Sequence, residues 1–248
     1  KARKKGTKVI YTAHGFHFFK GAPLFNWNFY YPIERICARL TDVLITINKE
    51  DYGLAQRFKV KSVKYIPGVG VDTQKLKNAS VNINQKRKEL EIPEDAVLIL
   101  SVGELNKNKN HKVVIKALSK INNPNICYCI CGHGNLKTEL ISLAEILGIK
   151  NTVKFLGYRN DMDEIYKAAD IFIIPSKREG LPRSLMEAMA AGLPVICSDI
   201  RGNTELIIGG KGGYLCSPND INGFSNAIEK LVNDKELRIN MGNFNKAA

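Results

Sequence analysis

Short apolar runs alternate with segments of helical spacing from Ala96 to the end of the chain. The apolar runs occupy residues 97–102, 126–131, 152–156, 171–174, 195–198 and 214–216. Helical spacing is found at 111–121, 136–147, 161–168, 204–208 and 221–232, and a further helix follows residue 182. Apolar runs without polar alternation are typical of strands buried on both faces of a parallel sheet. The pattern therefore predicts an α/β fold with a doubly wound, Rossmann-like parallel sheet.

The first ninety or so residues contain fewer strands. Strand-like runs lie at 8–12, 43–47 and 63–66, and helical segments lie at 32–40 and 49–58. Two or three strands are too few for an independent α/β layer of usual size, so we expect part of this domain to precede residue 1. The polar, lysine-rich stretch that follows is typical of a connection between two sheets. We predict a partial N-terminal Rossmann-like domain at 1–73, a connection at 74–95 and a C-terminal domain at 96–248.

The formal net charge of +13 predicts an anionic partner. The sequence contains no nucleic-acid-binding module, and its basic residues are scattered rather than interleaved with aromatic residues along one element. A nucleotide-linked substrate together with an anionic membrane surface accounts for the charge better than a nucleic acid does. No apolar run reaches the roughly 18 to 20 residues that cross a bilayer. The basic residues 1–5 lead into a strand rather than a signal-peptide core. We expect a cytoplasmic protein that can lie on the inner face of the membrane.

The spacing of the cysteines indicates that they are core residues rather than metal ligands or disulfide partners. Cys127, Cys129 and Cys131 alternate along one apolar run and therefore share a face of the predicted strand. No group of Asp, His or Cys has the spacing of metal ligands. We expect a metal-independent protein without a cofactor.

Residues 175–192 carry the most specific pattern in the chain. A loop follows the apolar run 171–174, a helix opens at Pro182, and the helix ends at Gly192. Glu179 therefore lies in a loop at the carboxyl end of a strand, and Glu187 lies on the next helix, at the edge where open α/β sheets bind ligands. Free amides at a helix start can hold an anion, and carboxylates can accept hydrogen bonds from hydroxyls. A sugar attached to a diphosphate needs both.

Further short motifs accompany this pair. They are His14-Gly15, residues 67–72 (Pro-Gly-Val-Gly-Val-Asp), Gly103-Glu104-Leu105 with Lys109, and residues 155–158, 169–172 and 202–205. With them, the chain resembles the retaining glycosyltransferases of family four, which have two facing Rossmann-like domains in the GT-B architecture. The aromatic insert at 16–23 is similar to that of members that build capsular or exopolysaccharide repeat units. Complete members carry further residues at the amino end, in agreement with the partial first domain.

The resemblance implies roles for the residues of the 175–192 pattern. Glu187 would hold the ribose hydroxyls of a nucleotide-sugar donor. Glu179 would lie near the hydroxyls and the reacting face of the donor sugar. The backbone amides of Gly180 and Leu181 would bind the diphosphate.

Donor contacts are also implied outside that pattern. Gly103 and the nearby Lys109 would contact the donor, with Lys109 stabilising the departing diphosphate, and His14 would contact the donor sugar or a phosphate. Tyr158 and Arg159 would frame the nucleobase, Arg159 mainly through backbone groups. His17, His111 and His133 are interpreted as structural.

The chain departs from the family pattern at Glu104, where the usual residue is arginine. A carboxylate close to a diphosphate would repel it. Glu104 is therefore expected either to turn away or to contact a hydroxyl, and a clamp of two cations is in doubt. Lys107 and Arg183 are the candidates to supply the second cation in place of the missing arginine.

The resemblance favours a retaining hexosyltransferase that uses a nucleotide-sugar donor, most simply a UDP-sugar. Its acceptor would be a lipid-linked sugar or an oligosaccharide in cell-surface polysaccharide synthesis. Two alternatives stay open at this point: a nucleotide-sugar epimerase of the same architecture, and a nucleotide-sugar-binding module without catalysis.

Overall fold

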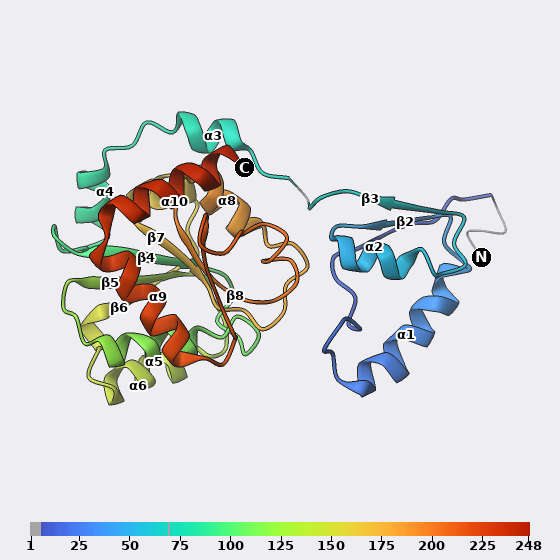
Figure 1. Ribbon diagram of the computed structural model, residues 1–248, viewed down its shortest axis with the longest axis horizontal. Coiled ribbons are helices and arrows are strands. Elements are labelled where there is room, and N and C mark those ends of the chain that lie inside the picture. Colours follow the sequence, from blue (N-terminus) through green and yellow to red (C-terminus); the bar gives the residue numbers. More distant parts are fainter. Residues whose placement is uncertain (1–5, 69) are drawn as a thin grey trace. The chain divides into compact units, whose positions relative to one another are not determined.

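The computed structural model describes residues 6–68 and 70–248. The basic start at 1–5 and Val69 of the 67–72 motif lie outside the described residues. The chain forms two compact units. The first unit holds the residues up to Gly70 together with Glu179–Arg183, and the second holds Val71–Arg178 together with Ser184–Ala248. Each unit is described by itself (Figure 1).

The second unit is built on a sheet of six parallel strands in the order β6-β5-β4-β7-β8-β9 (Figure 1). The strands are β4 (Val97–Val102), β5 (Ile126–Cys131), β6 (Val153–Gly157), β7 (Ile171–Ile174), β8 (Val195–Ser198) and β9 (Gly213–Cys216). Strand order reverses between β4 and β7, which pair directly through Ile99 with Ile171 and Leu100 with Phe172. This topology confirms the predicted doubly wound α/β fold and places a switch point between β4 and β7.

Helices cover both faces of this sheet. They are α4 (Ile83–Glu89), α5 (His111–Ile121), α6 (Lys137–Ile146), α7 (Met162–Ala168), α8 (Arg183–Ala191), α9 (Ile221–Asn233) and α10 (Lys235–Ala247), with a 3-10 turn at Lys150–Thr152 and α3 at Thr73–Asn78. Tyr128 faces the core beneath α5 and α9, whereas the alternating Cys127, Cys129 and Cys131 face the core beneath α7 and α8. The predicted placement of these three thiols on one buried face is confirmed, and all are free.

The first unit contains three parallel strands, β1 (Ile10–Ala13), β2 (Val43–Thr46) and β3 (Ser62–Tyr65), in sequence order. The helices are α1 (Leu24–Ala38) and α2 (Lys49–Ala55). An aromatic core forms where Phe16 and Phe18 stack at 4.8 Å and Phe58 packs against both. Asn48 caps α2 by accepting a hydrogen bond from the amide of Asp51 at 2.8 Å.

Two helical expectations were wrong, and one helix was not expected. Helix α1 begins at Leu24 rather than at Pro32, because Trp27 and Tyr31 pack on the aromatic core and extend the helix upstream of the proline. Residues 204–208 form turns and irregular backbone instead of a helix. Helix α10 was not expected, because its sequence is polar; it is held instead by Asn245, whose side-chain amide donates to the carbonyls of Leu193 at 2.8 Å and Gly212 at 2.7 Å.

Candidate functional site

The loops that follow β4 and β5 lie in direct contact at the carboxyl edge of the six-stranded sheet. The amide of Leu105 donates to the carbonyl of His133 at 2.9 Å. A Cβ atom on Gly132 would overlap the carbonyl oxygen of Gly103, and one on Gly134 would overlap the carbonyl oxygen of Leu105. Glycine is therefore required at both positions for this close approach of two backbones.

Side chains join the loop after β4 to the loop after β7, on the two sides of the switch point. The side-chain amide of Asn108 donates to the carbonyl of Arg178 at 3.0 Å, and the amide of Lys177 donates to the carbonyl of Asn108 at 2.8 Å. Asn110, which has a left-handed backbone with φ of 55°, donates to the carbonyl of Pro175 at 3.1 Å. The sequence analysis missed these asparagines. Their signal was the Asn-Lys-Asn-Lys-Asn run between a strand and a helix, because asparagine tolerates this backbone conformation.

A cavity of about 640 Å³ opens at the carboxyl ends of β4, β5 and β6 within the second unit. Its lining residues are Val102, Gly103, Glu104, Cys131, Gly132, His133, Gly134, Tyr158, Arg159 and Met162. The volume lies in the range of small-molecule sites. Three residues predicted to bind the donor, Gly103, Tyr158 and Arg159, therefore share one cavity.

Lys109 lies next to this cavity. A Cβ atom on Gly103 would be 3.1 Å from Cε and 3.2 Å from Cδ of Lys109, so the lysine side chain covers Gly103. Its backbone amide donates to the side-chain oxygen of Asn106 at 2.9 Å, which fixes the loop that carries it. The structure therefore brings Lys109 beside Gly103, as the sequence spacing suggested.

Glu104 lies in the cavity wall and is exposed. Its carboxylate accepts a hydrogen bond from the side-chain amide of Asn106 at 2.7 Å. An exposed carboxylate in this position can accept hydrogen bonds from ligand hydroxyls.

His133 also lines the cavity, although it was interpreted from the sequence as a structural residue. Its Nε2 accepts a hydrogen bond from the backbone amide of Tyr158 at 3.1 Å, and the two rings are nearly parallel with centroids 6.4 Å apart. The histidine thus fixes the loop after β6 and presents a ring to the cavity. One signal for this role was present in the sequence, because His133 stands between the two glycines that the loop contact requires.

The other two histidines with a structural interpretation lie elsewhere. His111 is buried, its Nδ1 lies 3.1 Å from the hydroxyl of Tyr128, and burial lowers its pKa to about 4. His17 is exposed and stacks on Tyr30 at 4.5 Å.

Arg159 enters the cavity wall as a member of an ion-pair network. Its guanidinium pairs with Asp161 and, at 2.7 Å, with Glu89 of α4. Lys86 of the same helix is 2.9 Å from Asp161, 2.6 Å from Glu89 and 2.7 Å from Glu164. Because the side chain of Arg159 is committed to carboxylates, the groups that it offers a ligand are mainly backbone groups.

Glu187 lies on α8 and is half-buried, outside the lining of the 640 Å³ cavity. Its Oε2 accepts a hydrogen bond from the hydroxyl of Tyr166 at 3.0 Å, and this hydroxyl also lies 3.2 Å from the carbonyl of Ser184. Tyr166 is fully buried on α7, so it orients the carboxylate from a fixed position. The sequence analysis missed Tyr166, whose position in an apolar helical pattern indicated only a core residue.

Glu179, Gly180 and Leu181 belong to the first unit together with His14. Within that unit, a Cβ atom on Gly180 would overlap the carbonyl oxygen of His14, so the two backbones touch. His14 is exposed, whereas Leu181 is buried. Since Glu187 lies in the other unit, a common pocket for Glu179 and Glu187 stays a prediction.

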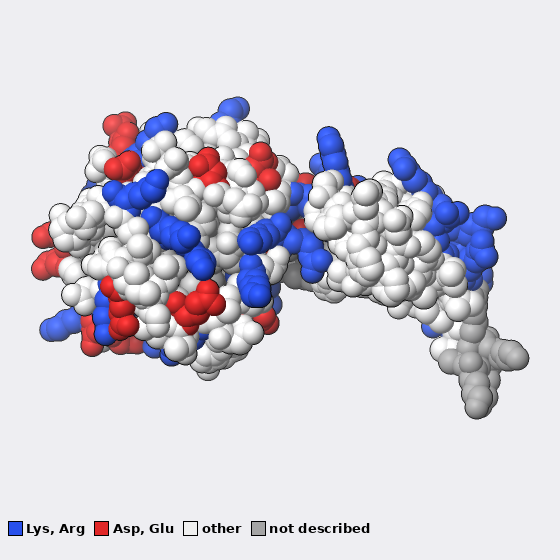
Figure 2. Space-filling view, turned by 90° about the horizontal axis from the view of Figure 1, so that it is seen from below, with Lys and Arg blue, Asp and Glu red and all other residues white. Residues whose placement is uncertain are grey.

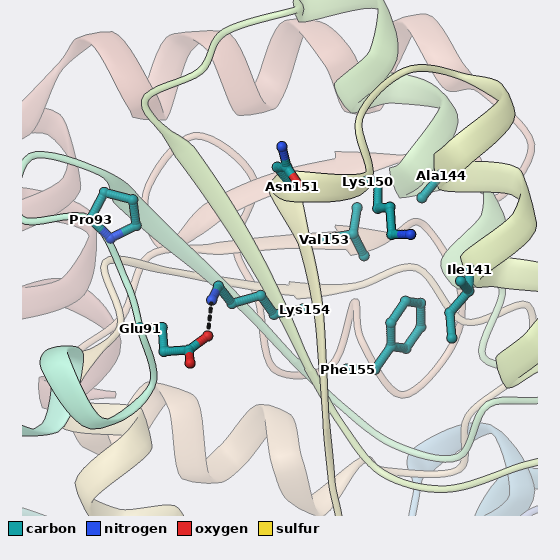
Figure 3. Close-up of a pocket in the computed structure, with 9 residues that line it drawn as sticks. All are labelled: Glu91, Pro93, Ile141, Ala144, Lys150, Asn151, Val153, Lys154 and Phe155. Atoms are coloured by element: carbon teal, nitrogen blue, oxygen red, sulfur yellow. Dashed lines mark hydrogen bonds and ion pairs between the residues drawn. The ribbon is translucent and has the colours of Figure 1, made fainter.

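A second cavity, of about 460 Å³, lies between α6 and the edge strand β6 (Figure 3). Its apolar wall is formed by Ile141 and Ala144 from α6 and by Val153 and Phe155 from β6. Two cations line it, and both are paired with carboxylates. Lys154 lies 3.0 Å from Glu91, and Lys150 lies 2.7 Å from Glu145. None of the residues predicted to bind the donor lines this cavity.

Two features of the described residues concern metal ions and membranes. Residues 6–68 and 70–248 contain no group of three or more His, Cys, Asp or Glu side chains that could hold a metal ion. In the same part of the chain, every helix is too short or too polar to traverse a lipid bilayer.

Comparison with known sequences identifies relatives along nearly the whole chain. Residues 82–248 match the family model described as glycosyl transferases group 1. The chain is 40% identical over 246 residues to "Putative glycosyltransferase EpsD" of Bacillus subtilis (strain 168), covering 97% of this chain and 65% of that protein. It is 33% identical over 244 residues to "UDP-Gal:alpha-D-GlcNAc-diphosphoundecaprenol alpha-1,3-galactosyltransferase" of Escherichia coli, covering 93% and 62%. The chain thus spans less than two thirds of the length of these relatives.

Comparison with solved structures agrees. Anabaena Alr3699/HepE, crystallised with UDP-glucose, aligns with a TM-score of 0.86 at 21% identity over 99% of this chain and 68% of that chain. WaaG, a glycosyltransferase involved in lipopolysaccharide biosynthesis, aligns with a TM-score of 0.80 at 20% identity over 99% and 74%. These likenesses confirm the expected Rossmann-like GT-B fold.

Proposed function

The chain belongs to the group 1 glycosyl transferases, and from this premise we propose that the protein transfers a sugar from a nucleotide-sugar donor with retention of anomeric configuration. The main support for binding of a nucleotide-sugar donor is the cavity at the carboxyl ends of β4, β5 and β6. Open α/β sheets bind nucleotides at this edge. Glycine backbone, a lysine beside Gly103 and ring surfaces at His133 and Tyr158 meet there.

The proposed donor is a UDP-sugar. Tyr158 and the backbone of Arg159 would frame the base, and Glu187, oriented by Tyr166, would accept hydrogen bonds from the ribose hydroxyls. Support for uridine comes from the Escherichia coli relative, whose name specifies UDP-Gal, and from the HepE structure with UDP-glucose. Glu104 adds a further acceptor for sugar or ribose hydroxyls in the cavity wall.

In the proposed reaction, the bond between the anomeric carbon and the diphosphate oxygen breaks. A bond to an acceptor hydroxyl oxygen forms on the same face of the sugar, and the proton of that hydroxyl passes to the departing diphosphate oxygen. Lys109 and the amides of Gly180 and Leu181 would stabilise the departing diphosphate, because charges and dipoles fixed in advance cost no reorganisation. Glu179 would offset the positive charge at the anomeric carbon, and His14 would contact the donor sugar or a phosphate. Positioning and electrostatics supply most of the catalysis in this scheme, without a metal.

The proposed acceptor is a lipid-linked sugar or an oligosaccharide, in the synthesis of a cell-surface polysaccharide such as a capsule or exopolysaccharide. The named acceptor of the Escherichia coli relative is linked to diphosphoundecaprenol. Such an acceptor is held in a membrane, and residues 1–70 contain 13 of the 37 Lys and Arg but 4 of the 24 Asp and Glu. We therefore place the protein in the cytoplasm, in peripheral contact with the anionic inner face of the membrane.

A panel of UDP-, GDP- and ADP-sugars in a thermal-shift assay tests the donor, and a UDP-sugar is expected to raise the melting temperature most. A transfer assay on the complete protein, with proton NMR of the product, then tests the reaction and its stereochemistry. Donor binding without transfer would support the binding module, and an epimerised donor would support the epimerase. Loss of turnover in excess chelator, regained with one added metal, would contradict the metal-independent scheme.

A further inference from the structure

Glu104 lies between two residues whose backbones are fixed to the loop after β5. The amide of Gly103 donates to the carbonyl of Cys131 at 2.9 Å, and the amide of Leu105 donates to the carbonyl of His133 at 2.9 Å. Leu105 is fully buried, whereas Glu104 is exposed in the wall of the 640 Å³ cavity. The backbone position of Glu104 is therefore set by the contacts between these two loops.

The carboxylate of Glu104 is oriented by Asn106. Its Oε2 accepts a hydrogen bond from the side-chain amide of Asn106 at 2.7 Å. The side-chain oxygen of Asn106 in turn accepts a hydrogen bond from the backbone amide of Lys109 at 2.9 Å. The side chain of Lys109 covers Gly103. Asn106 therefore connects the carboxylate in the cavity wall to the segment that carries the proposed diphosphate cation.

The carboxylate of Glu104 differs from other carboxylates near the cavity, because no cation neutralises it. On the face of the second unit drawn in Figure 2, basic and acidic side chains are interspersed. Three carboxylates are paired with Lys86, namely Glu89, Asp161 and Glu164. Within residues 6–68 and 70–248, no Lys, Arg or His forms an ion pair with Glu104, whose carboxylate is held by the amide of Asn106. Its negative charge therefore acts on any ligand that enters the cavity.

The place of Glu104 in the cavity decides which part of the proposed donor it meets. Tyr158 and Arg159 follow β6, Glu104 follows β4, and β5 lies between these two strands. With the base at Tyr158 and Arg159, the end of the cavity beside Lys109 receives the diphosphate and the sugar. A carboxylate there can accept hydrogen bonds from neighbouring sugar hydroxyls. It repels a terminal phosphate more than an esterified one, because a terminal phosphate loses a second proton near neutral pH.

We propose that Glu104 makes this site favour a nucleotide sugar over the free nucleoside diphosphate. In the donor complex, the carboxylate accepts hydrogen bonds from hydroxyls of the hexose. In the product complex, it repels the additional negative charge of the terminal phosphate. The donor is thereby selected in the presence of its own product, and the product is released more readily after transfer. This inference rests on the proposed function, since it takes a UDP-sugar as the donor and UDP as the product.

Calorimetric titration of the complete protein with UDP, UDP-glucose and UDP-galactose tests this role. We expect Glu104→Gln to bind UDP about three- to fivefold more tightly than the parent, because the repelling charge is removed while the shape of the side chain is kept. We expect Glu104→Ala to bind the preferred UDP-hexose about fivefold less tightly, because the hydroxyls lose their acceptor. The matched control, Glu229→Gln, removes an exposed charge from α9 and is expected to leave both affinities unchanged.

The variant Asn106→Ala tests whether Asn106 acts through Glu104. The measured quantity is the dissociation constant of UDP divided by that of the preferred UDP-hexose. This ratio is expected to fall about tenfold in Glu104→Ala and by a smaller factor in Asn106→Ala. Adding Asn106→Ala to Glu104→Ala should change the ratio by less than about twofold, because residues that act as one unit are not additive. Added salt should reduce the gain in UDP affinity of Glu104→Gln, because charges are screened.

The outcomes separate this inference from the proposed function. Equal changes in the affinities for UDP and the UDP-hexoses, or no change in either, would overturn the role of Glu104 and leave the proposed function unaffected. Weaker binding of UDP by Glu104→Gln would show that the carboxylate contacts the ribose or a bound cation, and would also overturn it. A parent protein that binds neither UDP nor a UDP-hexose would refute the proposed donor and this inference together.

Discussion

The guanidinium of Arg159 and the carboxylate of Asp161 form a two-point ion pair, with Nε 2.8 Å from Oδ1 and Nη2 2.6 Å from Oδ2. This pair lies at the start of α7, and Lys86 joins it to α4. The hydrogen bonds from Arg159 and Lys86 hold the pKa of Asp161 well below its usual range. The network therefore ties the loop after β6, which lines the cavity, to a helix distant in sequence.

The variant Asp161→Asn is expected to lower the free energy of unfolding by about 1 to 2 kcal/mol at neutral pH, since it breaks a charge-assisted pair that is partly exposed. A carboxyl with a lowered folded-state pKa contributes stability above its unfolded pKa of about 4 and loses it as the pH falls further. Urea unfolding at decreasing pH should therefore show a steeper loss below that pH in the parent than in the variant. The control is Asp163→Asn, whose longer ion pair to Lys75, at 3.5 Å, should make both effects smaller.

The variant Gly132→Ala is expected to cost about 1 to 3 kcal/mol of stability and to weaken donor binding, because the new Cβ would overlap the carbonyl of Gly103. Thermal unfolding and calorimetry with UDP measure the two effects. Gly53→Ala in α2 serves as the control, since no atom lies within 4 Å of its new Cβ. A stable Gly132→Ala protein with parental affinity would show that the loop contact is not needed.

The variant Tyr166→Phe removes the hydroxyl that donates a hydrogen bond to Glu187 and keeps the buried ring. We expect the dissociation constant for UDP to rise about five- to tenfold, and more for Glu187→Ala, because a mispositioned carboxylate holds the ribose less well. Isothermal calorimetry gives both values, with the exposed Glu229→Ala of α9 as control. Unchanged affinity in both variants would remove Glu187 from the donor site.

The variant Glu179→Ala is expected to reduce kcat by about 100-fold while the dissociation constant of UDP changes less than threefold, because its proposed role is confined to the transition state. Steady-state kinetics of the complete protein and calorimetry measure the two quantities. Equal losses in binding and turnover would instead assign Glu179 to ground-state binding of the donor.

The variant Lys109→Ala is compared with Lys107→Ala to decide which lysine serves the diphosphate. Lys109 covers Gly103, whereas Lys107 is exposed. We expect Lys109→Ala to lower kcat/KM by about 100-fold and Lys107→Ala by less than threefold, since one positioned cation stabilises the departing charge. The reverse order in steady-state kinetics would transfer the role to Lys107.

Strands in the second unit were predictable because apolar runs such as Ile126–Cys131 are buried on both faces and leave a continuous signal. The family resemblance pointed to Gly103, Tyr158 and Arg159, which line one cavity, and their role in donor binding stays a prediction. Helix α10 and Tyr166 were missed, because the mostly polar sequence of α10 hides its buried residues, Met241 and Asn245, and because Tyr166 contacts Glu187 from 21 residues away. The ion pair between Arg159 and Glu89 was hidden because Glu89 is 70 residues away in the sequence.

The place of the 640 Å³ cavity at the carboxyl ends of β4, β5 and β6 has a consequence for how this protein can diversify. The cavity wall comes from loops that are attached to the sheet only at the strand ends, so substitutions at Tyr158 or Glu104 leave the interior packing intact. In the proposed donor site, a change of nucleotide or sugar preference therefore requires only a few loop exchanges on an unaltered scaffold.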